Sequence, residues 1–316
     1  MTARTVLVTG AAGFIGSHVC GALLRRGDRV RGIDSFDPFY DPALKRRNIE
    51  EARRAGDLPL VEGDVRDEGR VREALAGCDA VIHLAAKAGV RPSLRDPVGY
   101  ADVNVRGTAV VLEEAIRAGA RTFVAASSSS VYGARSKVPF AEGDPCDRPV
   151  SPYAATKRAM ELLCAARQGR ASLDLPCLRF FTAYGPRQRP EMAIHLFARS
   201  IEEGRPITVF GDGGSRRDYT YIDDTVDGVL RALDCARGFR VYNLGESRTV
   251  PLSELVALLE AALGRKAVVE RRPDQPGDVP LTCADVSLAR AELGYEPRVP
   301  IEEGLRRFVE WMRAAR

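Results

Sequence analysis

The chain has 316 residues and a formal net charge of only +4, from 47 Lys and Arg against 43 Asp and Glu. Hydrophobic residues make up 45% and charged residues 28%, which is typical of a globular enzyme and excludes a disordered or collagen-like chain. So small a net charge argues against a dedicated nucleic-acid-binding protein, and we expect no nucleic-acid partner. The basic residues are strongly biased, because only Lys45, Lys87, Lys137, Lys157 and Lys266 are lysines.

Cysteine and histidine usage bears on compartment and metal binding. The number of Cys is seven, which is odd, and none forms a CxxC pair, so we expect free thiols and a cytoplasmic location. The three His are scattered without an HExxH motif, and no metal site is expected. The chain also lacks an uninterrupted run of about 18 apolar residues, so we expect no membrane span.

Short apolar runs alternate with longer helical patterns over the first 180 residues or so. In chain order, the expected strands are 5–9, 29–34, 58–61, 79–84, 122–126 and 175–181. The expected helices between them are 14–26, 41–55, 67–76, 100–118 and 152–167. Strands without internal alternation, separated by helices, indicate a parallel sheet covered on both faces. We therefore predict the α/β class, with a Rossmann-type doubly wound parallel sheet.

The character of the sequence changes after Thr182, where Gly and Pro become frequent and the elements become short. This change predicts a smaller C-terminal α/β substrate domain. The run 242–244 is typical of a strand that returns to the main sheet. We therefore predict a cofactor domain of 1–181 with a returning segment at about 231–256, and a substrate domain of 182–230 and 257–316.

A GxxGxxG pattern, formed by Gly10, Gly13 and Gly16, lies between the first strand and the first helix. The first Gly permits a tight turn, the second lets the backbone approach a pyrophosphate at the helix N-terminus, and the third permits close helix–strand packing. A lone glycine triplet also occurs in ordinary turns. Its position after an apolar strand favours dinucleotide binding.

Two acidic positions extend this interpretation. Asp34 ends the second strand, 24 residues after Gly10, as expected for a carboxylate that binds the adenosine ribose 2′-hydroxyl. It would repel a 2′-phosphate, and Ser35 and Phe36 supply no Arg, so we predict NAD rather than NADP. Asp34 could instead be only a turn residue. Asp64 and Val65 form a candidate adenine contact, for which a helix cap is nearly as good an explanation.

Tyr153 and Lys157 stand four residues apart in a helix that begins near Pro152, so they share one face. An ammonium near a phenol favours the phenolate and lowers the Tyr pKa, which would make Tyr153 a general base. Alone, such a spacing often arises by chance on a solvated helix. Four consecutive serines, 127–130, follow the fifth expected strand, at the edge of the sheet where open α/β folds bind ligands.

Several motifs together resemble the extended short-chain dehydrogenase/reductase superfamily in its nucleotide-sugar branch, over essentially the whole chain. They are TGAAGFIG at 9–16, HLAAKAGVRPS at 83–93, SPYAATK at 151–157, LRFFTAYGPRQRP at 178–190, FGDGGSRRDYTYIDD at 210–224 and QPGDVPLTCADVS at 275–287. Within this branch the chain is most similar to the UDP-glucuronate 4-epimerases. The resemblance implies an isomerase that inverts C4 of UDP-glucuronate, giving UDP-galacturonate, through a 4-keto intermediate with enzyme-bound NAD.

The resemblance also implies roles for particular residues. The catalytic triad falls on Ser128, Tyr153 and Lys157. Further cofactor contacts fall on Phe14, Ile15, Leu84, Ala85, Ala86 and Lys87. Relatives often dimerise through the helices near 100–118 and 152–167, so we expect a homodimer.

Differences between related enzymes suggest the substrate. Nucleotide-sugar 4,6-dehydratases carry acids at the positions of Ser129 and Ser130, and UDP-galactose 4-epimerases typically carry Asn at Thr182. Here Ser129, Ser130 and Thr182, with Arg189, resemble a set that binds a sugar carboxylate. The resemblance places Arg217 and Asp278 at the UDP moiety. A UDP-glucose or UDP-N-acetylglucosamine 4-epimerase, a nucleotide-sugar 4-reductase and a non-catalytic NAD sensor remain alternatives.

Overall fold

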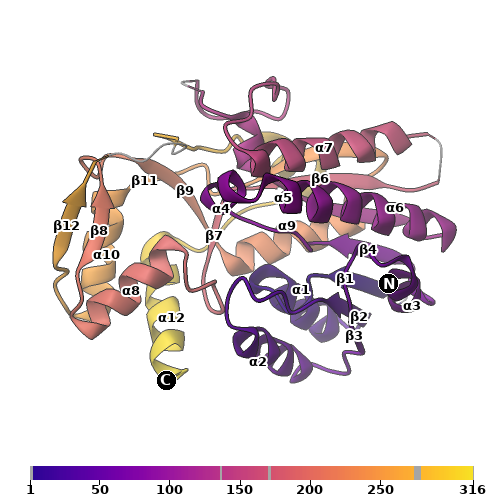
Figure 1. Cartoon of the computed structure of the whole chain (residues 1–316), viewed down its shortest axis with the longest axis horizontal. Helices are drawn as coiled ribbons and strands as arrows, with labels where there is room; N and C mark the ends of the chain where they lie inside the picture. The colour runs from indigo at the N-terminus through magenta and orange to yellow at the C-terminus, as the bar shows by residue number, and fades with distance from the viewer. Residues whose placement is uncertain (1–2, 136, 170–171, 274–278, 316) are drawn as a thin grey trace.

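Seven parallel strands lie side by side in the order β10-β6-β5-β4-β1-β2-β3 in the computed structural model, which describes residues 3–135, 137–169, 172–273 and 279–315 (Figure 1). The strands of this sheet are β1 (Thr5–Thr9), β2 (Arg29–Asp34), β3 (Leu60–Glu62), β4 (Ala80–His83), β5 (Thr122–Ser128), β6 (Leu175–Phe180) and β10 (Phe239–Leu244). The strand order reverses direction between β1 and β4, and dinucleotides bind at the carboxyl edge of such a reversal. This architecture confirms the predicted fold class.

Helices cover both faces of the sheet. They are α1 (Phe14–Arg25), α2 (Pro42–Arg53) and α9 (Ile222–Cys235) on one face, and α3 (Glu68–Leu75), α6 (Gly107–Arg117) and α7 (Pro152–Arg167) on the other. The short helices α4 (Val90–Arg95) and α5 (Pro97–Ala101) pack against α7. Each face buries its own apolar cluster, which is why the strands are apolar throughout instead of alternating.

The structure differs from the predicted elements in two places near the site. The predicted helix 100–118 is α5 followed by a π-helical turn, Asp102–Arg106, and then α6. This turn places the Asn104 side chain so that its Oδ1 accepts from the Lys87 backbone N–H at 2.8 Å. In addition, β5 runs through Ser128, because Ser127 and Ser128 pair with β6 instead of leaving the sheet.

Beyond β6 the chain builds two small sheets, which Figure 1 shows to the left of the main sheet. Their strands are β7 (Thr182–Tyr184), β9 (Arg216–Tyr221) and β11 (Thr249–Pro251) in one sheet, and β8 (Ile207–Phe210) and β12 (Val269–Arg272) in the other. The accompanying helices are α8 (Ala193–Glu203), α10 (Leu252–Leu263), α11 (Ser287–Leu293) and α12 (Ile301–Ala314). The predicted returning strand at 242–244 is the end of β10, which pairs with β6. The exact domain division stays a prediction.

One apolar cluster joins the two parts of the molecule. It runs from Val8 on β1 through Tyr184 on β7 to Phe308 on α12, all of them buried. Continuous packing of this kind fixes the small sheets relative to the carboxyl edge of the main sheet. Within the described ranges, every helix is too short or too polar to cross a bilayer.

Candidate active site

A cavity of about 920 Å³ opens at the carboxyl edge of the main sheet, and it gathers residues from both halves of the chain. Almost all of the predicted site residues line it: Gly10, Gly13, Phe14, Ile15, Gly16, Asp34, Asp64, Val65, Leu84, Ala85, Ala86, Lys87, Ser128, Ser129, Ser130, Tyr153, Lys157, Thr182 and Arg189. Among the described residues the exception is Arg217. The predicted Asp278 lies outside the described residues. The strand order therefore brings together positions that are up to 179 residues apart in sequence.

The glycine loop has the close geometry that its motif predicts. Gly10 has a φ of +67°, and a Cβ added there would lie 2.8 Å from the backbone N of Ala85. A Cβ at Gly16 would lie 2.1 Å from the carbonyl oxygen of Gly10. Larger side chains would therefore force apart the loop, α1 and the end of β4. The N–H groups at the start of α1 receive no side-chain cap within the described part of the chain and border the cavity, where they and the helix dipole favour an anion.

Asp34 stands at the end of β2 with only 7% of its surface exposed. Its Oδ2 accepts from the Ala12 N–H of the glycine loop at 3.0 Å, and its Oδ1 accepts from the Phe36 N–H at 2.8 Å. Burial raises the pKa of Asp34, while these hydrogen bonds and the charge of Lys45 oppose the rise. Asp34 therefore holds the turn and also presents a carboxylate to the cavity.

Two further lining residues, Tyr40 and Lys45, were missed by the sequence reasoning. Lys45 is buried, donates from Nζ to the Asp37 carbonyl at 2.8 Å, and lies 4.8 Å from the Tyr40 ring centroid. The buried Tyr40 hydroxyl has no hydrogen-bond partner among the described residues. The sequence held one indication that Lys45 matters: it is a lysine in a chain that uses Arg at almost every other basic position.

Asp64 is not the helix cap that was considered as an alternative. The N-cap of α3 is Asp67, whose side chain accepts from Gly69 and Arg70. Asp64 instead pairs with Arg66 at 2.6 Å, and this hydrogen bond lowers the pKa of Asp64. Asp64 and Val65 line the cavity shortly after the end of β3, and the adenine contact there stays a prediction.

The predicted catalytic trio comes from two adjacent elements. Ser128 ends β5, whereas Tyr153 and Lys157 lie on the first turns of α7. That helix begins where the sequence predicts, because the Ser151 side chain accepts from the Ala154 N–H at 3.1 Å and Pro152 occupies its first turn.

The protonation of this trio differs from the sequence-based expectation. Lys157 Nζ donates to the Ala126 carbonyl at 2.7 Å and lies 6.0 Å from the Tyr153 ring centroid. Burial raises the pKa of Tyr153, and a hydrogen bond with Ser128 and the charge of Arg189 oppose the rise. The Tyr153 pKa is therefore raised, and the expected lowering by Lys157 is wrong. Burial also lowers the pKa of Lys157 to about 8.

Hydroxyl groups next to the trio also line the cavity. Ser129 and Ser130 lie in a 3₁₀ turn, Ser129–Tyr132, directly after β5, and Ser128 Oγ lies 3.2 Å from Ser130 Oγ. Thr182 opens β7, and Arg189 follows in the next loop, 3.3 Å from Glu191. The acidic residues among the described lining, Asp34, Asp37, Asp64 and Asp96, all come from other segments.

Lys87 and Arg217, which were predicted to contact the cofactor and the UDP moiety, have other partners in the structure. Lys87 lines the cavity, but its Nζ pairs with Asp96 Oδ2 at 2.6 Å. Arg217 is half-buried on β9 and donates to the carbonyl of Arg216 at 2.9 Å, outside the described lining. A role for Arg217 at a bound nucleotide stays a prediction.

The described residues fit NAD. The glycine loop supplies backbone donors for a pyrophosphate, Asp34 supplies an acceptor for a ribose diol, and the buried Tyr40 hydroxyl remains free to bind a ligand. A family model described as "NAD dependent epimerase/dehydratase family" matches residues 6–245. The chain belongs to this family. Membership confirms the predicted resemblance and NAD as the cofactor.

Individual members of this family resemble the chain over nearly its whole length. UDP-glucuronate 4-epimerase 5 of Arabidopsis thaliana is 46% identical, over 97% of this chain and 75% of that protein. A probable UDP-glucuronate 4-epimerase of Rhizobium meliloti is 40% identical, over 96% of each chain. The crystal structure of UDP-glucuronic acid 4-epimerase from Bacillus cereus, in complex with UDP-glucuronic acid and NAD, is 35% identical, with a TM-score of 0.92 over 99% of this chain and 100% of that one.

Proposed function

We propose that the protein catalyses the NAD-dependent 4-epimerisation of UDP-glucuronate to UDP-galacturonate. One observation carries the proposal: Ser129, Ser130, Thr182 and Arg189 line the same cavity as the trio, and the turn that follows Ser128 contains no acidic side chain. Such a lining suits a carboxylate on the sugar, whereas an acid would repel it. The names of the relatives described above support the same substrate.

The trio can carry out the proton transfer that inversion requires. NAD, when bound, accepts the hydride from C4, later returns it to the opposite face, and adds a positive charge that favours a phenolate. Tyr153 takes the proton from the sugar 4-hydroxyl as that carbon is oxidised and returns it when the ketone is reduced. Ser128 holds the same oxygen, and Lys157 keeps a positive charge beside them. Proton and electron pair both return, so no external reductant is consumed.

The 4-keto uronate is a β-keto acid and readily loses CO₂. We propose that Ser129, Ser130 and Thr182 suppress this loss by donating hydrogen bonds to the carboxylate, with Arg189 assisting. These donors would hold the carboxylate so that the bond between the carboxylate carbon and the sugar ring does not align with the π system of the ketone. Loss of CO₂ requires that alignment. The arrangement contains no acid that could drive elimination in place of epimerisation.

Product analysis tests this function. The purified protein is incubated with UDP-glucuronate without added NAD, and the products are resolved by chromatography. UDP-galacturonate supports the proposal, whereas a UDP-pentose indicates decarboxylation, and consumption of added NADH indicates a 4-reductase. No change would contradict it, with UDP-glucose and UDP-N-acetylglucosamine then tested as substrates.

Hydroxyl variants test the proposed carboxylate-binding set. We expect Ser130→Ala combined with Thr182→Val to raise the share of UDP-pentose. The exposed Ser253→Ala on α10 serves as the control and should leave the share unchanged. A double variant with the product ratio of the unmodified protein would contradict the proposed role of these hydroxyls.

The expected partner is a second copy of the chain. Leu94 and Val98 on α4 and α5 and Leu162 on α7 are exposed apolar side chains, and α4 and α5 both pack on α7. We propose that this face, with α6 beside it, forms a homodimer. Light scattering should give twice the monomer mass of 34.4 kDa. A Leu162→Glu variant should give the monomer mass.

A further inference from the structure

The inner face of α7 holds β5 at three successive turns. Tyr153 is hydrogen-bonded with Ser128, and Lys157 donates to the Ala126 carbonyl at 2.7 Å. One turn further, Glu161 accepts from the Ser127 hydroxyl at 2.6 Å. The helix therefore contacts each residue of the strand end that carries the catalytic serine. Glu161 is the member of this series that the proposed reaction does not use.

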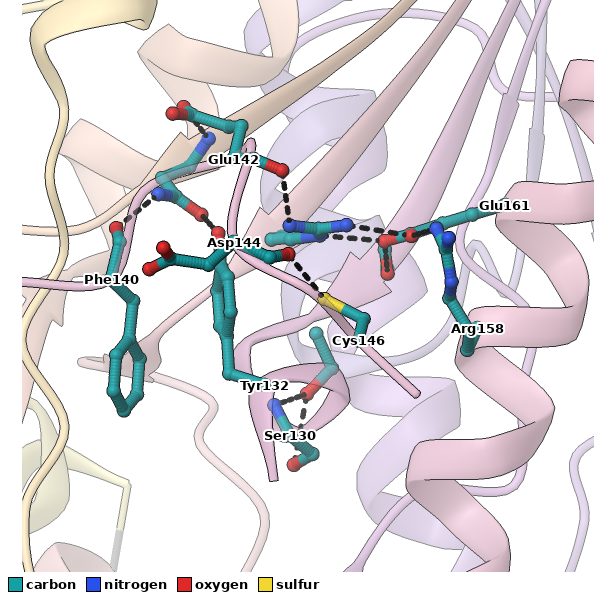
Figure 2. A network of polar contacts seen from close by, with 12 residues as sticks. Ser130, Tyr132, Phe140, Glu142, Asp144, Cys146, Arg158 and Glu161 are labelled. Atoms are coloured by element: carbon teal, nitrogen blue, oxygen red, sulfur yellow. Dashed lines mark hydrogen bonds and ion pairs between the residues drawn. The ribbon is translucent and has the colours of Figure 1, made fainter. Parts of the chain in front are cut away.

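Glu161 is paired with Arg179 of β6, a residue in register with Ser127. The Arg179 guanidinium donates to both carboxylate oxygens of Glu161, at 2.8 and 2.9 Å. Glu161 is 0% exposed and Arg179 is 2% exposed. Glu161 also accepts from Arg158 on the same helix, and Figure 2 shows these two side chains next to each other.

The same guanidinium ties the pair to more distant parts of the chain. It lies 4.7 Å from the ring centroid of Tyr132 and donates to the Glu142 carbonyl at 3.2 Å. Tyr132 in turn donates to Asn243 of β10 at 2.6 Å (Figure 2). The pair thus lies at the centre of a network that spans β5, β6, β10 and the serine turn.

A buried ion pair of this kind contributes little net stability, because desolvation of two charges offsets their attraction. An apolar pair of similar volume is often equally stable or more so. What a charged, bidentate pair adds is a fixed geometry. The pair contacts Ser127 and lies one helical turn from Lys157, so the geometry that it can fix is that of the strand end and of the Lys157 side chain.

We propose that Glu161 and Arg179 are positioning residues for the epimerisation proposed above, holding the Ser127–Ser128 strand end and the Lys157 ammonium in their working places. The inference rests on that proposed function. Glu161 acts through the Ser127 hydroxyl on the strand and through its charge on Lys157. Arg179 fixes the two oxygens of Glu161 so that one of them faces Ser127.

The charges around Lys157 give the direction of the electrostatic effect. The titratable groups that face it are Tyr153 and Glu161 on α7, Cys177 on β6 and His83 on β4. Burial lowers the pKa of Lys157, and Cys177 and Glu161 oppose that shift. Burial lowers the pKa of His83 to about 3, so it is neutral. Loss of the Glu161 charge should therefore lower the pKa of Lys157 further and reduce the ammonium fraction at neutral pH.

The low lysine content permits a direct measurement. In the purified holoenzyme labelled with [¹³Cε]lysine, only five lysine signals arise, and the signal lost in Lys157→Arg identifies Lys157. We expect Glu161→Gln to lower the titration midpoint of Lys157 by about one pH unit, as for removal of a nearby opposite charge. We expect kcat with UDP-glucuronate to fall about 10- to 100-fold, with KM little changed, as for misplacement of reacting groups.

Glu114→Gln is the matched control. Glu114 is also a buried glutamate, 2% exposed, and it pairs with Arg72 and Arg117, but it lies on α6 outside the described lining of the cavity. Glu114→Gln also removes one buried carboxylate charge, so it should unfold at a lower temperature than the unmodified protein. The Lys157 midpoint and kcat should stay as in the unmodified protein.

A double variant separates positioning from folding. Glu161→Leu with Arg179→Met removes both charges at similar volume, so thermal stability should recover to at least that of the unmodified protein. We expect kcat to stay about 10-fold or more below normal, because Ser127 then lacks its acceptor. If Glu161→Gln fails to fold, the kcat of this double variant tests whether the pair positions the catalytic residues.

Normal kcat in the double variant, or an unchanged Lys157 midpoint and kcat in Glu161→Gln, would overturn the proposal and make the pair purely structural. The lysine titration needs no substrate. A protein that converts no nucleotide sugar but shows the expected midpoint shift would contradict the proposed function and leave the electrostatic part of this inference supported.

Discussion

The two sides of the cavity are built from different kinds of segment. On the cofactor side, the glycine loop, Asp34 and the Tyr153–Lys157 pair all line the cavity as predicted. On the substrate side, the hydroxyl residues and Arg189 line it, but Arg217 lies outside the described lining. The residues of the cofactor side belong to motifs a few residues long, whereas those of the substrate side come from segments far apart in the sequence.

Removal of the proposed base should have the largest effect on the cofactor side of the cavity. We expect Tyr153→Phe to lower kcat by about 10²- to 10⁴-fold, the usual contribution of a general base. Because the phenyl ring keeps its packing, KM and bound NAD should change little. Initial rates measured by product chromatography check this, and a variant within threefold of normal would exclude Tyr153 as the base.

The second largest expected effect is a loss of affinity for NAD. Asp34→Ala removes a carboxylate that anchors the glycine loop and faces the cavity, so NAD binding should weaken about 10- to 100-fold, as for loss of a charged hydrogen-bond partner. Isothermal titration of the NAD-free protein measures the affinity. The exposed Asp147→Ala is the control. Equal affinities in the two variants would refute the assigned role.

Arg217→Ala tests whether a residue outside the described lining of the cavity still contributes to substrate binding. If Arg217 contacts the diphosphate of the bound substrate, KM should rise about tenfold while kcat stays the same, because binding of ground and transition states weakens equally. The adjacent, exposed Arg216→Ala should be nearly silent. If both variants have the normal KM, the diphosphate is held elsewhere.

The smallest expected effect comes from Tyr40, one of the two lining residues that the motifs did not reveal. Tyr40→Phe removes a buried hydroxyl without a described protein partner, so stability should not fall, and NAD should bind about two- to tenfold more weakly, as for loss of one neutral hydrogen bond. The same titration measures it. An unchanged affinity would show that Tyr40 does not contact the cofactor.

Local rules explain which features were predictable. The Gly10–Gly16 loop follows from three spaced glycines, and the start of α7 follows from Ser151 and Pro152, because each depends on neighbours within a turn. Strand register is not local. Ser127 and Ser128 proved to belong to β5 because β6 pairs with them.

The same limit applies to side-chain chemistry. Glu161 and Arg179 are 18 residues apart, and only the pairing of α7 with β5 and β6 brings them together behind Ser127. The spacing of Tyr153 and Lys157 predicted a lowered Tyr153 pKa, but burial depends on the whole fold and raises it. Lys45 had a compositional signal without a local motif to interpret it.

The fate of the C4 hydrogen distinguishes hydride transfer through bound NAD from other routes to the product. UDP-glucuronate deuterated at C4 is incubated in ordinary water with the purified protein and no added NAD, and the product is analysed by mass spectrometry and NMR. We expect UDP-galacturonate that retains deuterium at C4, because in the proposed reaction the hydride passes to bound NAD and returns. Unlabelled product, or no UDP-galacturonate at all, would contradict it.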